Sequence, residues 1–184
     1  ITPGAIQKLI RPETALISIV AVQGEIGAIQ PIKEISRMLK AENPKIILHT
    51  DACQNLMFLD VSPHTLGADI ASYDAQKLMG PKGVGLLWRK PSVMLEPVVR
   101  GGGQERKLRP GTENTMAIVG MAEAFELATQ GRTERVKKVS VVRDYFIELL
   151  KTEIPQAEIN GALEHRIANN VNISIPGTDG DYLS

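Results

Sequence analysis

The sequence predicts an α/β protein organised around a mostly parallel β-sheet. Residues 14–22, TALISIVAV, form a nearly continuous apolar and β-rich run, which is typical of a strand buried on both faces of a parallel sheet. Residues 31–40 follow with helical periodicity, and residues 45–50, KIILHT, form a second strand-like run. A strand, a helix and a strand in this order make a βαβ unit, which is the building block of a parallel sheet.

Length and composition limit the classes of protein to which this chain can belong. Its 184 residues suffice for one domain with a sizeable core, or for one domain and the start of another. With 43% hydrophobic and 23% charged residues, it has the composition of an ordinary globular protein. Its formal net charge of zero argues against a nucleic-acid binder, which is normally basic. It has no apolar run long enough to span a bilayer and no signal-peptide pattern, so no membrane association is expected.

The cysteine content and the chain ends add two expectations. Cys53 is the only cysteine and cannot form an internal disulfide, which favours a reducing, cytoplasmic compartment. We interpret Cys53 as a small buried residue, since unpaired cysteines are usually buried and inert. The chain begins without Met and stops shortly after the apolar run 171–175, so we expect it to be a piece of a longer protein.

Capping residues, prolines and apolar stripes predict where helices begin and end along the chain. Thr2 is a suitable N-cap, and Pro3 suits the first position of a short helix that Arg11-Pro12 ends. Thr112 is a suitable N-cap for a later helix over residues 115–128. The apolar stripes are expected to be Ile32, Ile35, Met38 and Leu39 in helix 31–40, Ile118, Met121, Ala122 and Phe125 in helix 115–128, and Val139, Val142, Phe146, Leu149 and Leu150 in a helix over 134–152.

The order of elements changes near Gly131. Before it, strands and helices alternate, with further strands expected over residues 70–73 and 84–88. After it come a long helix and two short strand-like runs. We therefore expect residues 1–131 to belong to a large α/β domain and residues 132–184 to form a linking helix and the start of a smaller domain.

Polar residues follow three of the expected strands, at Gln23–Glu25, His49–Gln54 and Tyr73–Lys77. Ligands bind outside the carboxyl ends of the strands in open parallel sheets, so these segments are expected to form one site. Lys77 lies just past a strand end, where a lysine amine can form a Schiff base if burial or a nearby cation favours its neutral form. The alternative is a solvated surface lysine, which is the common case.

Asp51 ends the strand over residues 45–50. A carboxylate in this place can pair with a protonated pyridine nitrogen, and pyridoxal-phosphate enzymes combine such an Asp with a Schiff-base Lys. Asp51 can equally cap the turn after its strand, and the sequence leaves both interpretations open. His49, His64 and His165 lack the spacing of metal ligands, so no metal site is expected.

Six motifs along the chain resemble those of the cysteine desulfurases, which belong to the class V aminotransferase group of pyridoxal-phosphate enzymes. They are E-I-G-x-I-Q-P-I from Glu25, H-T-D-A-x-Q from His49, Q-K-x-x-G-P-K-G-V-G from Gln76, G-G-G-Q-E from Gly101, R-P-G-T-E-N from Arg109 and N-N-x-N-I-S from Asn169. The resemblance implies the fold type I of pyridoxal-phosphate transferases. This chain would be the C-terminal half of the large domain and the start of the small C-terminal domain.

The resemblance also implies roles for individual residues. Lys77 is similar to the lysine that forms the internal aldimine with pyridoxal 5'-phosphate and then acts as general base. Asp51 is similar to the partner of the pyridine nitrogen, and Gln54 to the residue that hydrogen-bonds the phenolic oxygen. Thr112 is similar to the threonine that reaches the cofactor phosphate of the other subunit in a homodimer.

Three positions of the expected cofactor site depart from the family. Gln76 stands where the family usually has His, and glutamine cannot carry positive charge or shuttle protons as histidine does. Asp74 stands in place of a phosphate-binding Ser, and a buried carboxylate close to a phosphate is repulsive by several kcal/mol. Gly24 replaces an Asn near the cofactor. The family's persulfide cysteine and substrate-binding arginine are not in this chain.

Two functions remain as expectations. In the first, the intact protein removes sulfur from L-cysteine to give L-alanine and an enzyme persulfide for iron–sulfur cluster or thio-cofactor assembly, with a homodimer and sulfur-acceptor or scaffold proteins as partners. A selenocysteine lyase would share the same residues. In the second, a degenerate or truncated protein keeps the fold and dimer surface without binding the cofactor. We expect the piece described by this sequence to be inactive alone.

Overall fold

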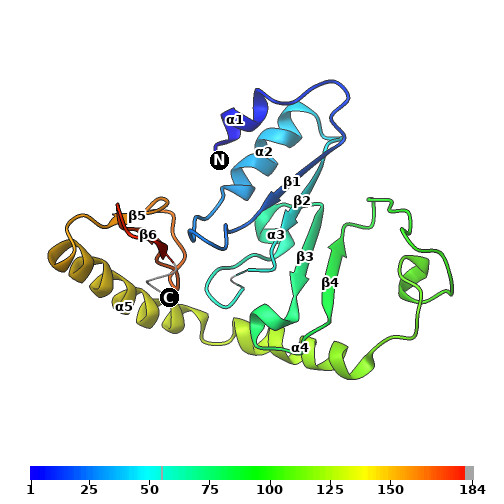
Figure 1. Cartoon of the computed structure of the whole chain (residues 1–184). Helices are drawn as coiled ribbons and strands as arrows, with labels where there is room; N and C mark the ends of the chain where they lie inside the picture. Colours follow the sequence, from blue (N-terminus) through cyan, green and yellow to red (C-terminus); the bar gives the residue numbers. More distant parts are fainter. Residues whose placement is uncertain (55, 181–184) are drawn as a thin grey trace.

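The computed structural model describes residues 1–54 and 56–180 of the chain, and Figure 1 shows their arrangement. Within these residues the main sheet has four strands in the order β1-β2-β3-β4. The first three strands are parallel, and the fourth is antiparallel to β3. The strands are β1 (Leu16–Val20), β2 (Ile47–Asp51), β3 (Ile70–Asp74) and β4 (Gly85–Arg89). The expected α/β class with a mostly parallel sheet is therefore confirmed.

The core lies on one face of this sheet. Ile19 of β1, Leu48 of β2 and Ala71 of β3 point to that face and join one buried cluster with α2 (Ile32–Glu42). Three of the four apolar residues expected on α2, namely Ile32, Ile35 and Leu39, are buried, which confirms most of its stripe. The other helices of this half are α1 (Pro3–Gln7) and α3 (Pro63–Leu66).

The opposite face of the sheet is open to solvent. Leu16 of β1 is 55% exposed and Leu87 of β4 is 54% exposed. The expectation that residues 14–22 are buried on both faces is therefore wrong for the described chain. Side chains alternate between the two faces of a strand, and the core cluster takes up only one of them.

The short 3-10 helix η1 (Ala75–Leu78) follows β3 and packs against α4 (Thr115–Thr129). The helices approach closely because the contact uses small residues. A Cβ placed on Gly80 would lie 2.9 Å from the Cβ of Ala124, and one on Gly120 would lie 2.7 Å from Pro81.

This contact corrects the expected face and cap of α4. The buried side is formed by Ala117, Met121, Ala124 and Ala128, whereas Ile118 is 41% exposed. The N-cap is Asn114, whose side chain accepts a hydrogen bond from the Ala117 N–H at 3.2 Å, and not Thr112.

Gly131 separates α4 from α5 (Arg132–Glu153) and adopts a left-handed conformation with φ of +61°. The expected stripe of α5 is largely wrong, since Ile147 and Leu150 are buried but Val142 is 68% exposed. The strands β5 (Glu158–Ile159) and β6 (Ile173–Ser174) form a separate two-stranded antiparallel sheet next to α5 (Figure 1). In residues 1–54 and 56–180, no helix is long and apolar enough to cross a membrane.

Candidate functional site

The carboxyl ends of the three parallel strands lie side by side. Val20 pairs with Asp51 between β1 and β2, and Asp51 pairs with Ser72 between β2 and β3. The segments after these strands, including residues 23–25 and 51–54, therefore start from one edge of the sheet (Figure 1). This arrangement confirms the expectation, made from the βαβ order, that polar groups gather there.

Asp51 is exposed at the end of β2, on the open face of the sheet. Its Oδ1 accepts a hydrogen bond from the backbone N–H of Cys53 at 2.9 Å. The turn-capping role that the sequence left open is thus present. A carboxylate has two oxygens and about four lone pairs, so this cap leaves capacity for a second, charged donor. The two interpretations of Asp51 are compatible.

Cys53 follows Asp51 and is half-buried. Burial, followed by a hydrogen bond with Asp51, raises the pKa of the Cys53 thiol to about 12. The nucleophilic form of cysteine is the thiolate, and a raised pKa disfavours it. Cys53 is thus only half-buried and not fully buried as expected, while its raised pKa is consistent with low reactivity.

Gly24, in the loop after β1, lies against the side chain of Gln54. A Cβ placed on Gly24 would be 3.2 Å from Gln54 Nε2 and 3.5 Å from its Cδ. Any side chain at residue 24 would press on the Gln54 amide, which would have to move by a few tenths of an ångström. Gly24 thus leaves room beside the Gln54 amide.

A row of hydrogen bonds crosses the open face of the sheet below Asp51, and sequence reasoning did not find it. Ser18 Oγ lies 2.7 Å from His49 Nδ1, and His49 Nε2 lies 3.2 Å from Ser72 Oγ. His49 precedes Asp51 by two residues in the same strand, so the two side chains share a face. That period of two was the signal available in the sequence.

The third strand end carries Asp74 and Lys77. Asp74 Oδ1 accepts the backbone N–H of Gln76 at 3.2 Å, so this carboxylate caps η1. Ala75 and Leu78 anchor η1 in the core, while Gln76 and Lys77 are exposed. The described residues thus place Lys77 next to the strand ends without burying it, and the desolvation expected for a reactive lysine is not provided by them.

These residues fit the ring of pyridoxal phosphate better than its phosphate. Asp51, Gln54 and Lys77 offer a carboxylate, an amide and an amine at adjacent strand ends, which suits a protonated ring, a phenolic oxygen and an aldehyde. Asp74 already occupies the start of η1 with a negative charge. A phosphate held near this edge must therefore depend on groups other than Asp74 and the Gln76 N–H that it caps.

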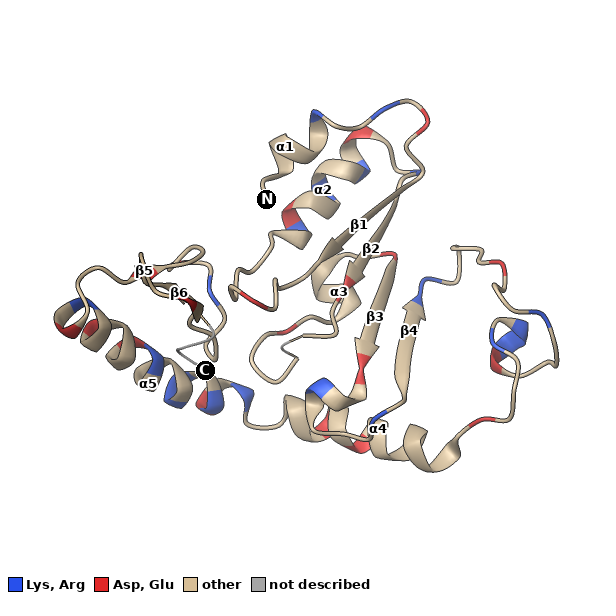
Figure 2. Ribbon diagram, viewed as in Figure 1, with Lys and Arg blue, Asp and Glu red and all other residues tan. Residues whose placement is uncertain are grey.

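Thr112 is not brought to the strand ends. It is exposed in the loop before α4, which also holds η2 (Glu105–Lys107) and extends beyond β4 (Figure 1). Figure 2 shows basic residues on η2, and the basic side chains of residues 100–109, all exposed, are those of Arg100, Arg106, Lys107 and Arg109.

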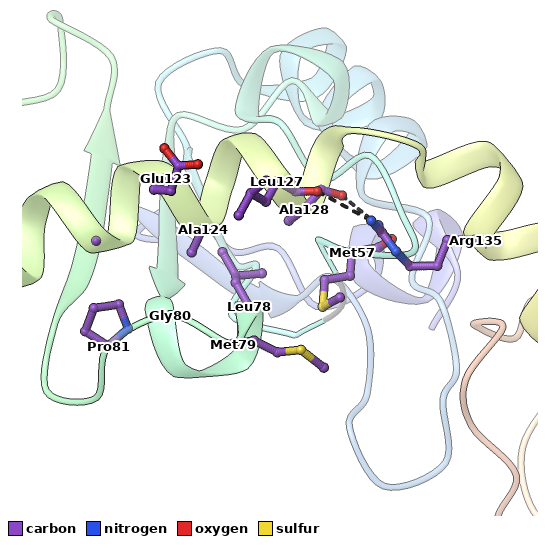
Figure 3. A pocket seen from close by; sticks show the side chains of 11 residues that line it. Met57, Leu78, Met79, Gly80, Pro81, Glu123, Ala124, Leu127, Ala128 and Arg135 are labelled. Carbon is purple, nitrogen blue, oxygen red and sulfur yellow. Dashed lines mark hydrogen bonds between the residues drawn. The ribbon is translucent and has the colours of Figure 1, made fainter.

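A cavity of about 540 Å³ lies between η1 and α4 (Figure 3). Leu78, Met79 and Leu127 give it an apolar wall. Arg135 Nη1 donates to the carbonyls of Met57 and Ala128, at 2.9 Å each, so its charge is held at the rim by backbone oxygens. Lys77, Asp51, Gln54 and Gly24 do not line the cavity.

Comparison with known proteins gives consistent relationships over the whole chain. The family model described as aminotransferase class-V matches residues 1–184. A protein named cysteine desulfurase IscS from Dictyoglomus turgidum is 38% identical over 183 residues, covering 100% of this chain and 46% of that relative. One of the same name from Methanosarcina thermophila is 42% identical over 184 residues, covering 100% of this chain and 45% of the relative.

Solved structures give the same result for the fold. A NifS-like protein superposes with a TM-score of 0.93 at 36% identity, over 100% of this chain and 50% of the other. DndA from Streptomyces lividans superposes with a TM-score of 0.87 at 32% identity, over 100% of this chain and 52% of the other. The chain spans about half the length of the curated relatives it matches.

Proposed function

Because the chain belongs to the class-V aminotransferase family, we propose that the intact protein is a pyridoxal-phosphate-dependent cysteine desulfurase. It transfers the sulfur of L-cysteine to an enzyme thiol, which gives L-alanine and an enzyme persulfide. The observation that carries this proposal is the position of Asp51, Gln54 and Lys77 at the neighbouring carboxyl ends of β2 and β3. Identity of about 40% to proteins named cysteine desulfurase, over the full chain, supports it.

Each proposed site residue has one task. The bound cofactor supplies an electron sink for negative charge at the substrate Cα. Lys77 Nζ takes the Cα proton, and the Asp51 carboxylate holds a proton at the ring nitrogen. Gln54 Nε2 donates a hydrogen bond to the phenolic oxygen of the ring, and Gly24 allows the Gln54 amide to sit close to the loop after β1.

Two further residues complete the proposed site. Gln76, exposed beside Lys77, orients the cofactor through hydrogen bonds and moves no proton, because an amide does not titrate. Thr112 contacts the cofactor phosphate of the partner subunit in a homodimer, which suits its exposed position in a loop beyond β4. The persulfide-forming cysteine and the substrate-binding arginine lie outside this chain.

The proposal also includes the domains, the compartment and the partners of the protein. Residues 1–131 contribute to the large domain, and residues 132–184 link to the small one. The protein works in the cytoplasm and passes persulfide sulfur to acceptor or scaffold proteins. The alternative, a degenerate or truncated protein without cofactor, has Asp74, Gln76 and Gly24 in its favour, whereas Lys77, Asp51 and Gln54 together favour the enzyme.

The test is chemical trapping on the intact protein. The protein is incubated with pyridoxal phosphate, reduced with borohydride and mapped by peptide mass spectrometry. We expect visible absorbance and a reduced adduct on Lys77, both lost in Lys77→Ala. Lys82→Ala, which removes another exposed lysine of the same segment, should keep the adduct. A folded intact protein without any adduct would refute the proposal.

A further inference from the structure

The loop after β1 is held from outside the main sheet by the segment between β5 and β6. Asn170 Nδ2 donates hydrogen bonds to the carbonyls of Gly24 at 3.3 Å and Glu25 at 3.0 Å. Asn172 Nδ2 donates to the same Glu25 carbonyl at 3.2 Å. The loop that carries Gly24 therefore depends on side chains from the distant end of the described chain.

Asn170 is itself fixed by a buried cation. Arg166 is 6% exposed, and its Nη1 donates to Asn170 Oδ1 at 3.1 Å. Its Nη2 donates to the carbonyl of Asn160. With the amide oxygen of Asn170 engaged by Arg166, the amide nitrogen is directed at the loop.

The backbone joins the two segments on either side of this contact. Ile167 N–H donates to the Gly27 carbonyl at 2.9 Å, and Ile29 N–H donates to the His165 carbonyl at 2.8 Å. Two backbone hydrogen bonds and two asparagine side chains thus tie one short loop, so the contact is a built element of the fold and not a chance approach.

Gly27 shows how closely Asn170 approaches. Its φ is +67°, a conformation that residues with a side chain rarely adopt. A Cβ added to Gly27 would lie 2.6 Å from Asn170 Oδ1 and 2.7 Å from Asn170 Cβ. Glycine is needed here both for the backbone and for the room that Asn170 occupies.

The other side of the same loop faces the candidate site. Gly24 lies against the Gln54 amide, and Gln23 Oε1 accepts the Ile26 N–H at 2.8 Å, which closes the loop on itself. The loop is thus held between Gln54, three residues past the end of β2, and Asn170 on the segment before β6.

We propose that Asn170 is a positioning residue, which holds the Gly24–Glu25 backbone against Gln54 and so couples the β5–β6 unit to the cofactor site. The structural part of this inference stands on the contacts above, and its effect on the cofactor rests on the proposed function. Gln54 can hold one orientation only while the Gly24–Glu25 backbone beside it stays in place. The hydrogen bonds from Asn170 hold that backbone.

Asn170→Asp separates this role from general stability. The new carboxylate keeps an oxygen for Arg166, so the buried cation retains a partner, and the free energy of unfolding should fall by no more than the loss of the hydrogen bonds to the loop, about 1–2 kcal/mol. The lost N–H₂ group leaves the Gly24 and Glu25 carbonyls facing an oxygen instead of a donor. Asn169→Asp, at the exposed neighbouring position, makes the same change in charge without this contact and is the matched control.

Two measurements on the intact protein decide the proposal. In the absence of cofactor, hydrogen exchange at the Ile26 and Gly27 amides should quicken roughly tenfold in Asn170→Asp, as the loss of about one hydrogen bond predicts. The affinity for pyridoxal phosphate, measured by absorbance, should weaken by a similar factor. Asn169→Asp should change neither quantity.

Unchanged exchange in Asn170→Asp would overturn the proposal, because the restraint would not exist. Faster exchange with unchanged affinity would also overturn it, because the loop would then not position the site. A wild-type protein that binds no pyridoxal phosphate would refute the proposed function instead, and the exchange measurement alone would then decide whether Asn170 holds the loop.

Discussion

Asp69 offers a direct test of what holds the main sheet together next to the site. It lies at the start of β3, where its Oδ2 accepts the Leu48 N–H of β2 at 3.0 Å. Its Oδ1 accepts from the ammonium of Lys90, just past β4, and the side chain of Asp69 is only 17% exposed. One carboxylate thus joins three neighbouring strands, and Asp69→Asn should destabilise the fold.

The expected loss is about 1–3 kcal/mol in the free energy of unfolding. A hydrogen bond to a charged group contributes about 1.5–3 kcal/mol. Lys90 is 32% exposed, so its ion pair adds only about 0–1 kcal/mol, and asparagine can keep a weaker bond to the Leu48 N–H. Asp144→Asn is the control, because Asp144 is 61% exposed in its pair with Arg143 and should cost less than about 0.5 kcal/mol.

The pH dependence gives the assay its sharpest outcome. Burial alone would raise the pKa of Asp69, but the Leu48 N–H and the Lys90 ammonium outweigh it and hold the pKa below its usual range. A depressed pKa means that the stabilisation is present above the unfolded-state pKa and is lost as pH falls through the folded-state value.

The free energy of unfolding of the intact protein and of its Asp69→Asn variant should therefore be measured in urea at pH 7 and at pH 3. The difference between the two proteins should be smaller at pH 3. The reasoning would be refuted if Asp69→Asn lost no more free energy of unfolding than Asp144→Asn at pH 7, or if its loss were as large at pH 3 as at pH 7.

Three further outcomes are expected. Cys53, with its pKa raised to about 12, should react with iodoacetamide at pH 8 at least about a hundredfold more slowly in the folded than in the urea-unfolded protein, as followed by mass spectrometry. If the cofactor phosphate binds beside the start of η1, as the family resemblance implies, Asp74→Ser should raise the affinity for pyridoxal phosphate by at least about tenfold and leave that for pyridoxal unchanged, because it removes a negative charge that Asp74 places there; equal changes for both aldehydes would argue against this placement. Ile35→Ala, at a fully buried position of α2, should lower the free energy of unfolding by about 2–5 kcal/mol in urea, and a loss below about 1 kcal/mol would contradict the assigned core.

The strands and α2 could be predicted from sequence because their signals are local. The run over residues 14–22 and the stripe of Ile32, Ile35 and Leu39 depend on periodicity within one element. The common edge of Asp51 and the loop after β1 followed from the topology of a βαβ unit, which needs no side-chain detail. These features are the ones in which local pattern and tertiary structure agree.

The faces of α4 and α5 could not be predicted in this way. Helical spacing predicts stripes that include Ile118 and Val142, which are 41% and 68% exposed in the structure. The contact of α4 with η1 instead requires small residues, because a Cβ on Gly80, just after η1, would lie only 2.9 Å from the Cβ of Ala124. A close helix contact selects against large side chains at its centre, so the most hydrophobic stripe need not be the buried one.

The candidate site shows the same limit at longer range. Lys77, Asp51 and Gln54 could be proposed from the sequence because they lie at or just after strand ends and within the family's motifs, whereas Asn170 lies 146 residues from Gly24 and no local pattern joins them. Once the contact is known, the motif E-I-G at Glu25–Gly27 acquires a physical reason. Glu25 supplies a carbonyl to Asn170 and Asn172, and Gly27 leaves the space that Asn170 fills. The E-I-G motif after β1 and the N-N-x-N-I-S motif that leads into β6 are thus parts of one contact. A substitution in either motif should therefore change the position of Gln54.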